Sequence, residues 1–141
     1  MAHLYLIARI AGRSVAIDSD QVESVVDIGK VTPVPRASQH VRGLAALRSK
    51  VVTVIDTQSA LGVAGTSEAR RAVITRVEGH HYAMLVDGLD DVAPFELQPL
   101  AGGVSLDAAW SVAGRGVVSR DGEPILAIDL ASLVPSQAAI N

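Results

Sequence analysis

The second half of this 141-residue chain repeats the pattern of its first half, and this repetition limits the possible folds more than any other feature. Residues 43–56 (GLAALRSKVVTVID) align without gaps with residues 116–129 (GVVSRDGEPILAID). Four further positions align at a constant offset of 67, namely Gly12, Ala16, Val22 and Val25 with Gly79, Ala83, Leu89 and Val92. Apolar strand sequences can also align by chance, which is the competing explanation. The repetition predicts two similar small units packed against each other.

Each half consists of short apolar runs separated by turn residues, a pattern typical of an all-β protein. Strands are predicted at residues 4–10, 14–17, 41–47, 51–55, 72–77, 82–86, 112–119 and 125–128. Single helical turns are predicted at 18–23, 57–61 and 130–134. Asp56 and Asp129 directly precede the last two turns, so we expect both carboxylates to serve as N-caps.

The connecting segments are also readable from their composition. Residues 25–34 should be extended, because Pro33 and Pro35 exclude a helix there. Residues 64–71 and 94–105 are predicted to be loops, since small, polar, Pro and Gly residues dominate them.

The composition excludes several classes of function. Apolar residues make up 49% and charged residues 19% of the chain, which predicts a folded domain. A net charge of −3 argues against nucleic acid as a partner. The absence of cysteine excludes disulfides and thiolate sites and fits a reducing cytoplasm. No run approaches the ~20 apolar residues that span a bilayer, so we expect a soluble protein without direct membrane insertion.

The sequence carries no recognisable catalytic or metal motif, so we expect no enzyme activity, no cofactor and no metal. No Gly-x-Ser-x-Gly elbow or glycine-rich phosphate loop occurs. His80 and His81 are adjacent, and adjacent side chains on a strand point to opposite faces, which makes a shared metal unfavourable. The acidic run 87–91 (DGLDD) lacks the alternating ligands and final Glu of a calcium loop. A small metal-binding protein or hydrolase centred on the two histidines remains the alternative from a different class.

An ordered series of segments resembles the CheW-like domain family. The first half contains VTPVP at 31–35, VRGL at 41–44, Leu47-Arg48 and VVTVID at 51–56. The second half continues with LVDGLDDV at 85–92, GVV at 116–118 and the closing segment 125–133. The resemblance runs from about residue 4 to 134. It implies two five-stranded, SH3-like β-barrel subdomains around a shared core, with short helical turns.

The same resemblance implies one CheW-like domain over residues 1–141. The first barrel would occupy about 1–65 and the second 66–141, with a possible exchange of the N-terminal strand. Because the chain has no room for a receiver domain or a kinase core, a standalone coupling protein is expected.

The function implied by the resemblance is that of a non-enzymatic adaptor. It would couple the cytoplasmic signalling tips of chemoreceptors (methyl-accepting chemotaxis proteins) to the regulatory domain of a CheA-type histidine kinase. In the family, the groove between the barrels receives the receptor hairpin, and the outer barrel ends join kinase regulatory domains in rings. Other CheW-like domains in such rings are further possible partners, and the protein would be cytoplasmic and recruited to membrane receptor arrays.

Five residues are the candidates for receptor binding: Val22, Val25, Gly43, Arg48 and Val86. Of these, Arg48 matches the family's receptor-contacting arginine. The guanidinium of Arg48 suits carboxylates or backbone carbonyls of a partner helix, although a solvated turn charge is the simpler explanation. The three valines could line an apolar groove, but a core position is commoner for valine. Gly43 and Gly88 could equally serve backbone conformation or close packing. The resemblance assigns no kinase-contacting residue.

Departures from the family pattern fall at turns and surfaces. Ser49 stands where the family has Gly, Ser24 where it has an acidic residue, and Gln58 where it has Arg. These substitutions leave the apolar pattern intact. They favour, as an alternative, a diverged scaffold of another two-component pathway (pilus, gliding or developmental) or a competitor of the main coupler.

Overall fold

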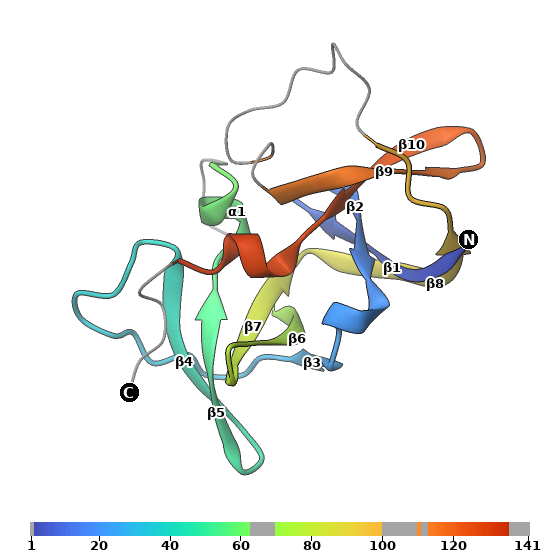
Figure 1. The fold of residues 1–141 in the computed structure, drawn as a ribbon. Helices are drawn as coiled ribbons and strands as arrows, with labels where there is room; N and C mark the ends of the chain where they lie inside the picture. Colours follow the sequence, from blue (N-terminus) through green and yellow to red (C-terminus); the bar gives the residue numbers. More distant parts are fainter. Residues whose placement is uncertain (1, 63–69, 100–109, 111–112, 136–141) are drawn as a thin grey trace.

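The computed structural model describes residues 2–62, 70–99, 110 and 113–135, and within them ten strands form two five-stranded sheets (Figure 1). The first half contributes β1 (His3–Ile10), β2 (Arg13–Asp18), β3 (Ser24–Asp27), β4 (Val41–Leu47) and β5 (Lys50–Ile55). The second half contributes β6 (Arg71–Val77), β7 (His80–Val86), β8 (Gly88–Phe95), β9 (Gly114–Arg120) and β10 (Glu123–Ile128). Three short helical elements connect or follow them: η1 (Ser19–Gln21), α1 (Thr57–Ala60) and η2 (Leu130–Leu133). The expected all-β class with two five-stranded units is confirmed.

The two sheets have the same topology. Sheet A has the order β8-β1-β2-β10-β9, and sheet B has the order β3-β6-β7-β5-β4. Replacing each strand of the first half by its counterpart in the second, and the reverse, converts one order into the other. Each sheet also contains one parallel pair, β10 with β2 in sheet A and β5 with β7 in sheet B. The internal repeat seen in the sequence is therefore a repeat of structure.

The sheets do not follow the division expected at residue 65. The whole N-terminal hairpin β1–β2 pairs with β8 and β10, and the hairpin β6–β7 pairs with β3 and β5. Each half thus donates a hairpin to the other half's sheet, whereas the sequence suggested exchange of a single strand. The reciprocal exchange interlocks the halves, so neither half contains a complete sheet of its own (Figure 1).

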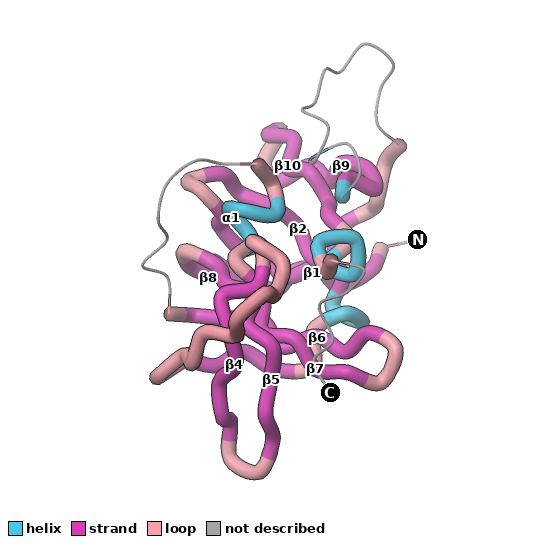
Figure 2. Tube along the Cα trace, turned by 90° about the vertical axis from the view of Figure 1, so that its left-hand side faces the viewer, coloured by secondary structure: helices cyan, strands magenta, loops and turns pink. Residues whose placement is uncertain are grey.

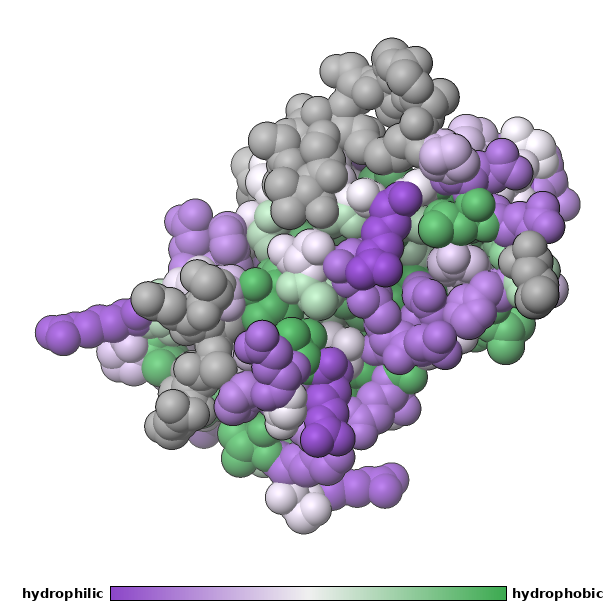
Figure 3. All heavy atoms as spheres, viewed as in Figure 1, coloured by the Kyte–Doolittle hydropathy of each residue, from purple (hydrophilic) through white to green (hydrophobic). Residues whose placement is uncertain are grey.

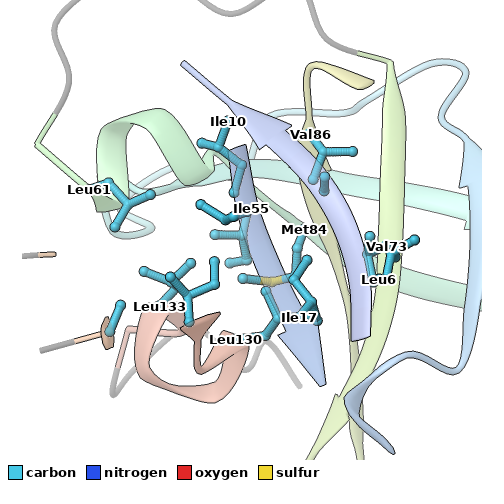
Figure 4. Packing of buried hydrophobic residues seen from close by; sticks show 14 of the residues in the cluster. Leu6, Ile10, Ile17, Ile55, Leu61, Val73, Met84, Val86, Leu130 and Leu133 are labelled. Carbon is cyan, nitrogen blue, oxygen red and sulfur yellow. The ribbon is translucent and has the colours of Figure 1, made fainter. Parts of the chain in front are cut away.

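Three clusters of buried side chains fill the molecule, because the hairpin strands are covered on both faces. Along β7, Tyr82 and Met84 point to a central cluster shared by both sheets, and Ala83 and Leu85 point into the interior of sheet B. The central cluster includes the residues labelled in Figure 4, namely Leu6, Ile10, Ile17, Ile55, Leu61, Val73, Met84, Val86, Leu130 and Leu133. A separate cluster around Ile7, Ala16 and Val118 fills sheet A. Burial on both faces explains the continuous apolar runs of the sequence.

In each half, a glycine in an edge strand lets a neighbouring backbone segment approach closely. These segments, called straps, lie at Thr32 and at Gln98. Thr32 exchanges two backbone hydrogen bonds with Leu44 of β4, and Gln98 does the same with Val117 of β9. A Cβ on Gly43 would overlap the carbonyl oxygen of Thr32, and a Cβ on Gly116 would overlap that of Gln98. Gly43 is therefore required for close backbone approach, which its φ of +151° also favours.

Several expected boundaries differ in the structure. The extended segment 25–34 is regular only as β3, and β8 continues through Pro94 and Phe95, which were expected in a loop. Pro94 is tolerated because β8 is an edge strand, where a missing donor is harmless. Residues 64–69 of the expected loop 64–71 and residues 100–105 of the expected loop 94–105 lie outside the described residues.

Candidate partner-binding groove

A groove of about 670 Å³ opens between the two edge strands of sheet B. Its walls are β3 and the end of the β4–β5 hairpin, and Val52 and Ile74 line it with buried side chains. Val25 on β3 is 39% exposed and contributes an aliphatic surface at this site. The groove is a hydrophobic channel with a polar rim, the usual character of a protein-binding surface.

Arg48 lies on the rim of this groove, at the tip of the β4–β5 hairpin. In Figure 1 this hairpin projects away from the body of the molecule. Arg48 has a φ of +53°, whereas Ser49 is not among the residues with positive φ. The tips at Gly12, Gly79 and Gly122 differ, because there both turn residues have positive φ. Ser49 thus gives the Arg48 turn a backbone conformation unlike that of the other three hairpins.

Three further polar side chains meet beside Arg48. His81 Nε2 lies 3.0 Å from a carboxylate oxygen of Glu23 and 3.3 Å from Lys50 Nζ. Lys50 Nζ is 3.8 Å from the other oxygen of Glu23. Glu23 and Lys50 both line the groove, so this cluster contributes to the charge of its rim.

A second hollow, of about 330 Å³, lies where the two sheets meet. It is lined by residues of η1, β6 and η2 and by Val22. Glu23 lines this hollow and the groove, so the two are neighbours on the surface. Val22 therefore faces the junction of the sheets, whereas Val25 and Arg48 share the groove of sheet B.

Two of the expected contact residues have structural surroundings instead. Val86 is 1% exposed within the central core, the commoner position for valine, so its contact with a receptor stays a prediction. Gly43 packs its backbone against the strap at Thr32. Gly88 lies against the guanidinium of Arg9, a flexible side chain that would have to move to admit a Cβ.

The corresponding mouth of sheet A, between β8 and β9, is crossed by ion pairs. Arg120 at the end of β9 lies 3.4 Å from Asp91 and 3.7 Å from Asp90, both on β8. Asp90 also approaches Arg9 of β1 at 3.4 Å. By the internal repeat, Arg120 corresponds to Leu47 and Asp91 to Ser24, both of which line the groove of sheet B. We call the ion pairs of Arg120 with Asp90 and Asp91 the latch. The counterparts of Arg120 and Asp91 in sheet B are uncharged and leave the groove open.

Matched capping networks hold the end of each repeat. Asp56 accepts a hydrogen bond from Ser59 N and pairs with Arg42 at 2.9 Å. Asp129 accepts from Ala131 N and pairs with Arg115 at 2.8 Å. Both expected N-caps are confirmed, and their arginine partners also occupy corresponding positions of the repeat.

Three of the groups with shifted pKa values have simple causes. Burial alone would raise the pKa of Asp129, but hydrogen bonds from Arg115, Gln21 and Ser132 outweigh it and lower the pKa. The hydrogen bond and charge of Asp129 in turn raise the pKa of Arg115. Burial, assisted by the nearby charge of Glu78, raises the pKa of Tyr82. None of these three groups lines the groove.

The histidines form no shared site in the part of the chain described. His81 contacts Glu23 and Lys50. The potential metal-ligating cluster found among the described residues lies elsewhere, where the ligand atoms of His3, Asp18 and Asp20 fall within 4.8 Å of one another. These three side chains are partly or fully exposed, and His3 already pairs with both carboxylates.

The rim cluster and the latch were not anticipated from the sequence. The signal for the latch was present, since the repeat aligns Arg120 and Asp91 with uncharged residues. Lys50 lies on β5, His81 on β7 and Glu23 directly before β3, so only the fold brings them together. Figure 3 shows that hydrophilic side chains cover much of the viewed face, with smaller apolar areas between them.

Comparison with known proteins agrees with this architecture. The model of the CheW-like domain matches residues 4–138. The chain is 24% identical to a chemotaxis protein CheW of Thermotoga maritima over 123 residues, 86% of this chain and 81% of the relative. It is 28% identical to a chemotaxis protein CheW of Rhizobium meliloti over 134 residues, 92% and 85% of the two chains.

A solved structure has the same fold. The crystal structure of a CheW scaffolding protein from Thermoanaerobacter tengcongensis superimposes with a TM-score of 0.83, at 22% identity, over 99% of this chain and 97% of that one. No helix among the described residues is long and apolar enough to cross a bilayer. The match along nearly the whole chain shows that this protein belongs to the CheW-like domain family.

Proposed function

We propose that this protein is a non-enzymatic adaptor that couples chemoreceptors to a CheA-type histidine kinase in bacterial chemotaxis. The observation that carries the proposal is the groove of sheet B, which places Arg48 beside the exposed side chain of Val25. Family membership supports the choice of partners, since two relatives are chemotaxis proteins named CheW. The protein would work in the cytoplasm, at receptor arrays.

The adaptor acts through geometry and carries out no chemical step. The signalling tip of a receptor is a helical hairpin, which can lay aliphatic side chains into the groove and present carboxylates or carbonyls to its rim. The guanidinium of Arg48 can bind either acceptor with two parallel hydrogen bonds. Val22 and the junction hollow extend this receptor-binding surface beyond Glu23.

The kinase regulatory domain would bind elsewhere. The β4–β5 and β9–β10 hairpins lie toward opposite ends of the molecule (Figures 1 and 2). The end at the β9–β10 hairpin, away from the groove, would be left for a kinase regulatory domain, or for another CheW-like domain, in a ring. Weak single contacts then add up through multivalency.

Titration calorimetry with a receptor signalling hairpin and with a CheA regulatory domain tests the proposal. Arg48→Ala should weaken receptor binding about tenfold, as expected for a charged contact at a binding site, and leave the melting temperature nearly unchanged. Asp121→Ala is the matched control, because it changes the corresponding tip of the other repeat. A folded protein that binds neither partner would refute the proposal, and unchanged receptor affinity in Arg48→Ala would refute the role of the groove.

One observation favours a second candidate, a diverged scaffold of another signalling pathway or a competitor of the main coupler. Ser24 and Ser49, which depart from the family pattern, both line the groove. Restoring the family residues with Ser24→Glu and Ser49→Gly should then increase affinity for a chemoreceptor hairpin. If the wild-type protein already binds more tightly than this variant, the second candidate is wrong.

A further inference from the structure

At the rim of the groove of sheet B, one ring nitrogen, Nε2 of His81, lies between a carboxylate and an ammonium group. His81 Nε2 is 3.0 Å from Glu23 Oε2 and 3.3 Å from Lys50 Nζ. The His81 side chain is 20% exposed, so solvent protons reach it. Building on the proposed function, the chemistry of this ring nitrogen indicates which partner segments the groove selects and under which conditions.

The two contacts of His81 exclude each other. An ammonium group only donates hydrogen bonds, so Lys50 can bond to Nε2 only while that nitrogen carries a lone pair. A carboxylate only accepts, so Glu23 can bond to Nε2 only while that nitrogen carries a proton. The ring therefore accepts from Lys50 only as the neutral tautomer that carries its proton on Nδ1. Both the neutral Nε2–H tautomer and the protonated ring donate to Glu23, so protonation always removes the Lys50 hydrogen bond.

Protonation consequently changes the charge that the rim presents. While the ring is neutral, the negative charge of Glu23 and the positive charge of Lys50 cancel. With a protonated ring, His81 neutralises Glu23 and repels Lys50, which is then available beside Arg48. The rim gains one positive charge, at a site where Arg48 already provides one.

The other charged groups around His81 do not cancel this gain. Arg76 of β6 lies opposite His81 in the antiparallel pair and is exposed. Glu78 and His80 belong to the exposed part of the β6–β7 hairpin.

We infer that the groove docks an apolar protein segment carrying carboxylates, and that His81 is a positioning residue whose protonation releases Lys50 and tightens this docking. Charge complementarity indicates this partner, because the cations of Arg48 and Lys50 flank an aliphatic groove. His81 lies beside the groove wall, so its protonation changes the preference for carboxylates while the ring itself stays outside the groove.

A first experiment uses the free protein and needs no partner. Nuclear magnetic resonance of the ionisable side chains should show that the His81 ring, the Glu23 carboxyl carbon and the Lys50 ammonium signal change together across one pH titration. In His81→Gln the Glu23 and Lys50 signals should lose this common step, because an amide can donate to Glu23 and accept from Lys50 at every pH. Independent titration of the three signals in the wild type would overturn the coupling.

A second experiment tests the selectivity with defined probes. A capped pentapeptide of alternating leucine and glutamate is titrated at pH 6 and pH 8, beside the same peptide with glutamine in place of glutamate. The glutamate peptide should shift amides of the groove and bind about two- to fivefold more tightly at pH 6, the effect of one exposed charge. His81→Gln should remove the pH dependence, and His80→Gln should retain it.

The results separate this inference from the proposed adaptor function. Equal binding of both peptides, binding of neither, or an unchanged pH dependence in His81→Gln would overturn the inference. Failure of the receptor hairpin to bind, together with pH-dependent binding of the glutamate peptide, would instead refute only the receptor as partner.

Discussion

The two barrels have the same strand order, yet their mouths differ. Between β3 and β4 a groove remains open, lined by Leu47 and Ser24. Between β8 and β9 the corresponding residues Arg120 and Asp91 form an ion pair across the gap. One fold repeated within one chain therefore carries an open surface at one end and a latched surface at the other. The comparison shows that a few surface residues, without any change in topology, distinguish the mouths of the two barrels.

The straps at the two edge strands offer the strongest test of the structural equivalence. Gly43→Ala should lower the free energy of unfolding by about 3 kcal/mol, because its Cβ would overlap a backbone carbonyl that cannot move freely. Gly116→Ala should act in the same direction but less strongly, since no positive φ adds to the overlap there. Urea unfolding of both variants measures the difference. Wild-type stability in both variants would show that the straps are not held as described.

Transfer of the latch is the sharpest test of the difference between the mouths. The double substitution Ser24→Asp with Leu47→Arg places the charges of sheet A in sheet B. It should reduce receptor binding more than tenfold by closing the groove, a change of more than about 1.4 kcal/mol. Surface plasmon resonance measures the affinity, and circular dichroism checks the fold. A folded double variant with full receptor affinity would show that the groove is not the docking surface.

The Asp129 cap should make the stability of the fold depend on pH. The folded-state pKa of Asp129 is lowered, so this carboxylate stabilises the fold above the unfolded pKa of about 4 and loses that effect as pH falls through its lower folded value. Asp129→Asn should thus lower stability by about 1 kcal/mol at pH 7 and progressively less below pH 4. Denaturant unfolding from pH 2 to 7 tests this. A deficit that stays constant down to pH 2 would contradict it.

The smallest expected effect concerns the hairpin tips. Ser49→Gly should let the Arg48 tip adopt the conformation of the other three, in which both turn residues have positive φ. Stability should change by no more than about 0.5 kcal/mol, because the tip is exposed. Backbone chemical shifts at Arg48 report the conformation. If these shifts stay unchanged, Ser49 is not what sets the turn.

Much of the architecture was predictable because burial leaves a clear mark on sequence. The strands with both faces covered appear as continuous apolar runs, and Asp56 and Asp129 stand at recognisable cap positions. The exchange of hairpins was not predictable to the same extent. Pairing β2 with β10 or β7 with β5 depends on contacts between residues far apart in the chain, which local patterns do not specify.

The site was less predictable than the fold, for reasons visible in single residues. Val25 and Val86 are both valines in strands, yet one lies at the groove and the other in the central core. Nothing in their local sequence separates the two environments. Arg48 was identifiable from its place in a turn, but its neighbours at the rim, Glu23 and His81, come from other elements.

The central claim is that the open groove of sheet B binds the receptor tip. Amide chemical shifts of the ¹⁵N-labelled protein, recorded while a receptor signalling hairpin is added, test this most directly. The largest changes should cluster at Val25, Leu47, Arg48 and Lys50, with little change at the corresponding tip around Asp121. Changes centred on the latched mouth of sheet A, or no changes at all, would contradict the account.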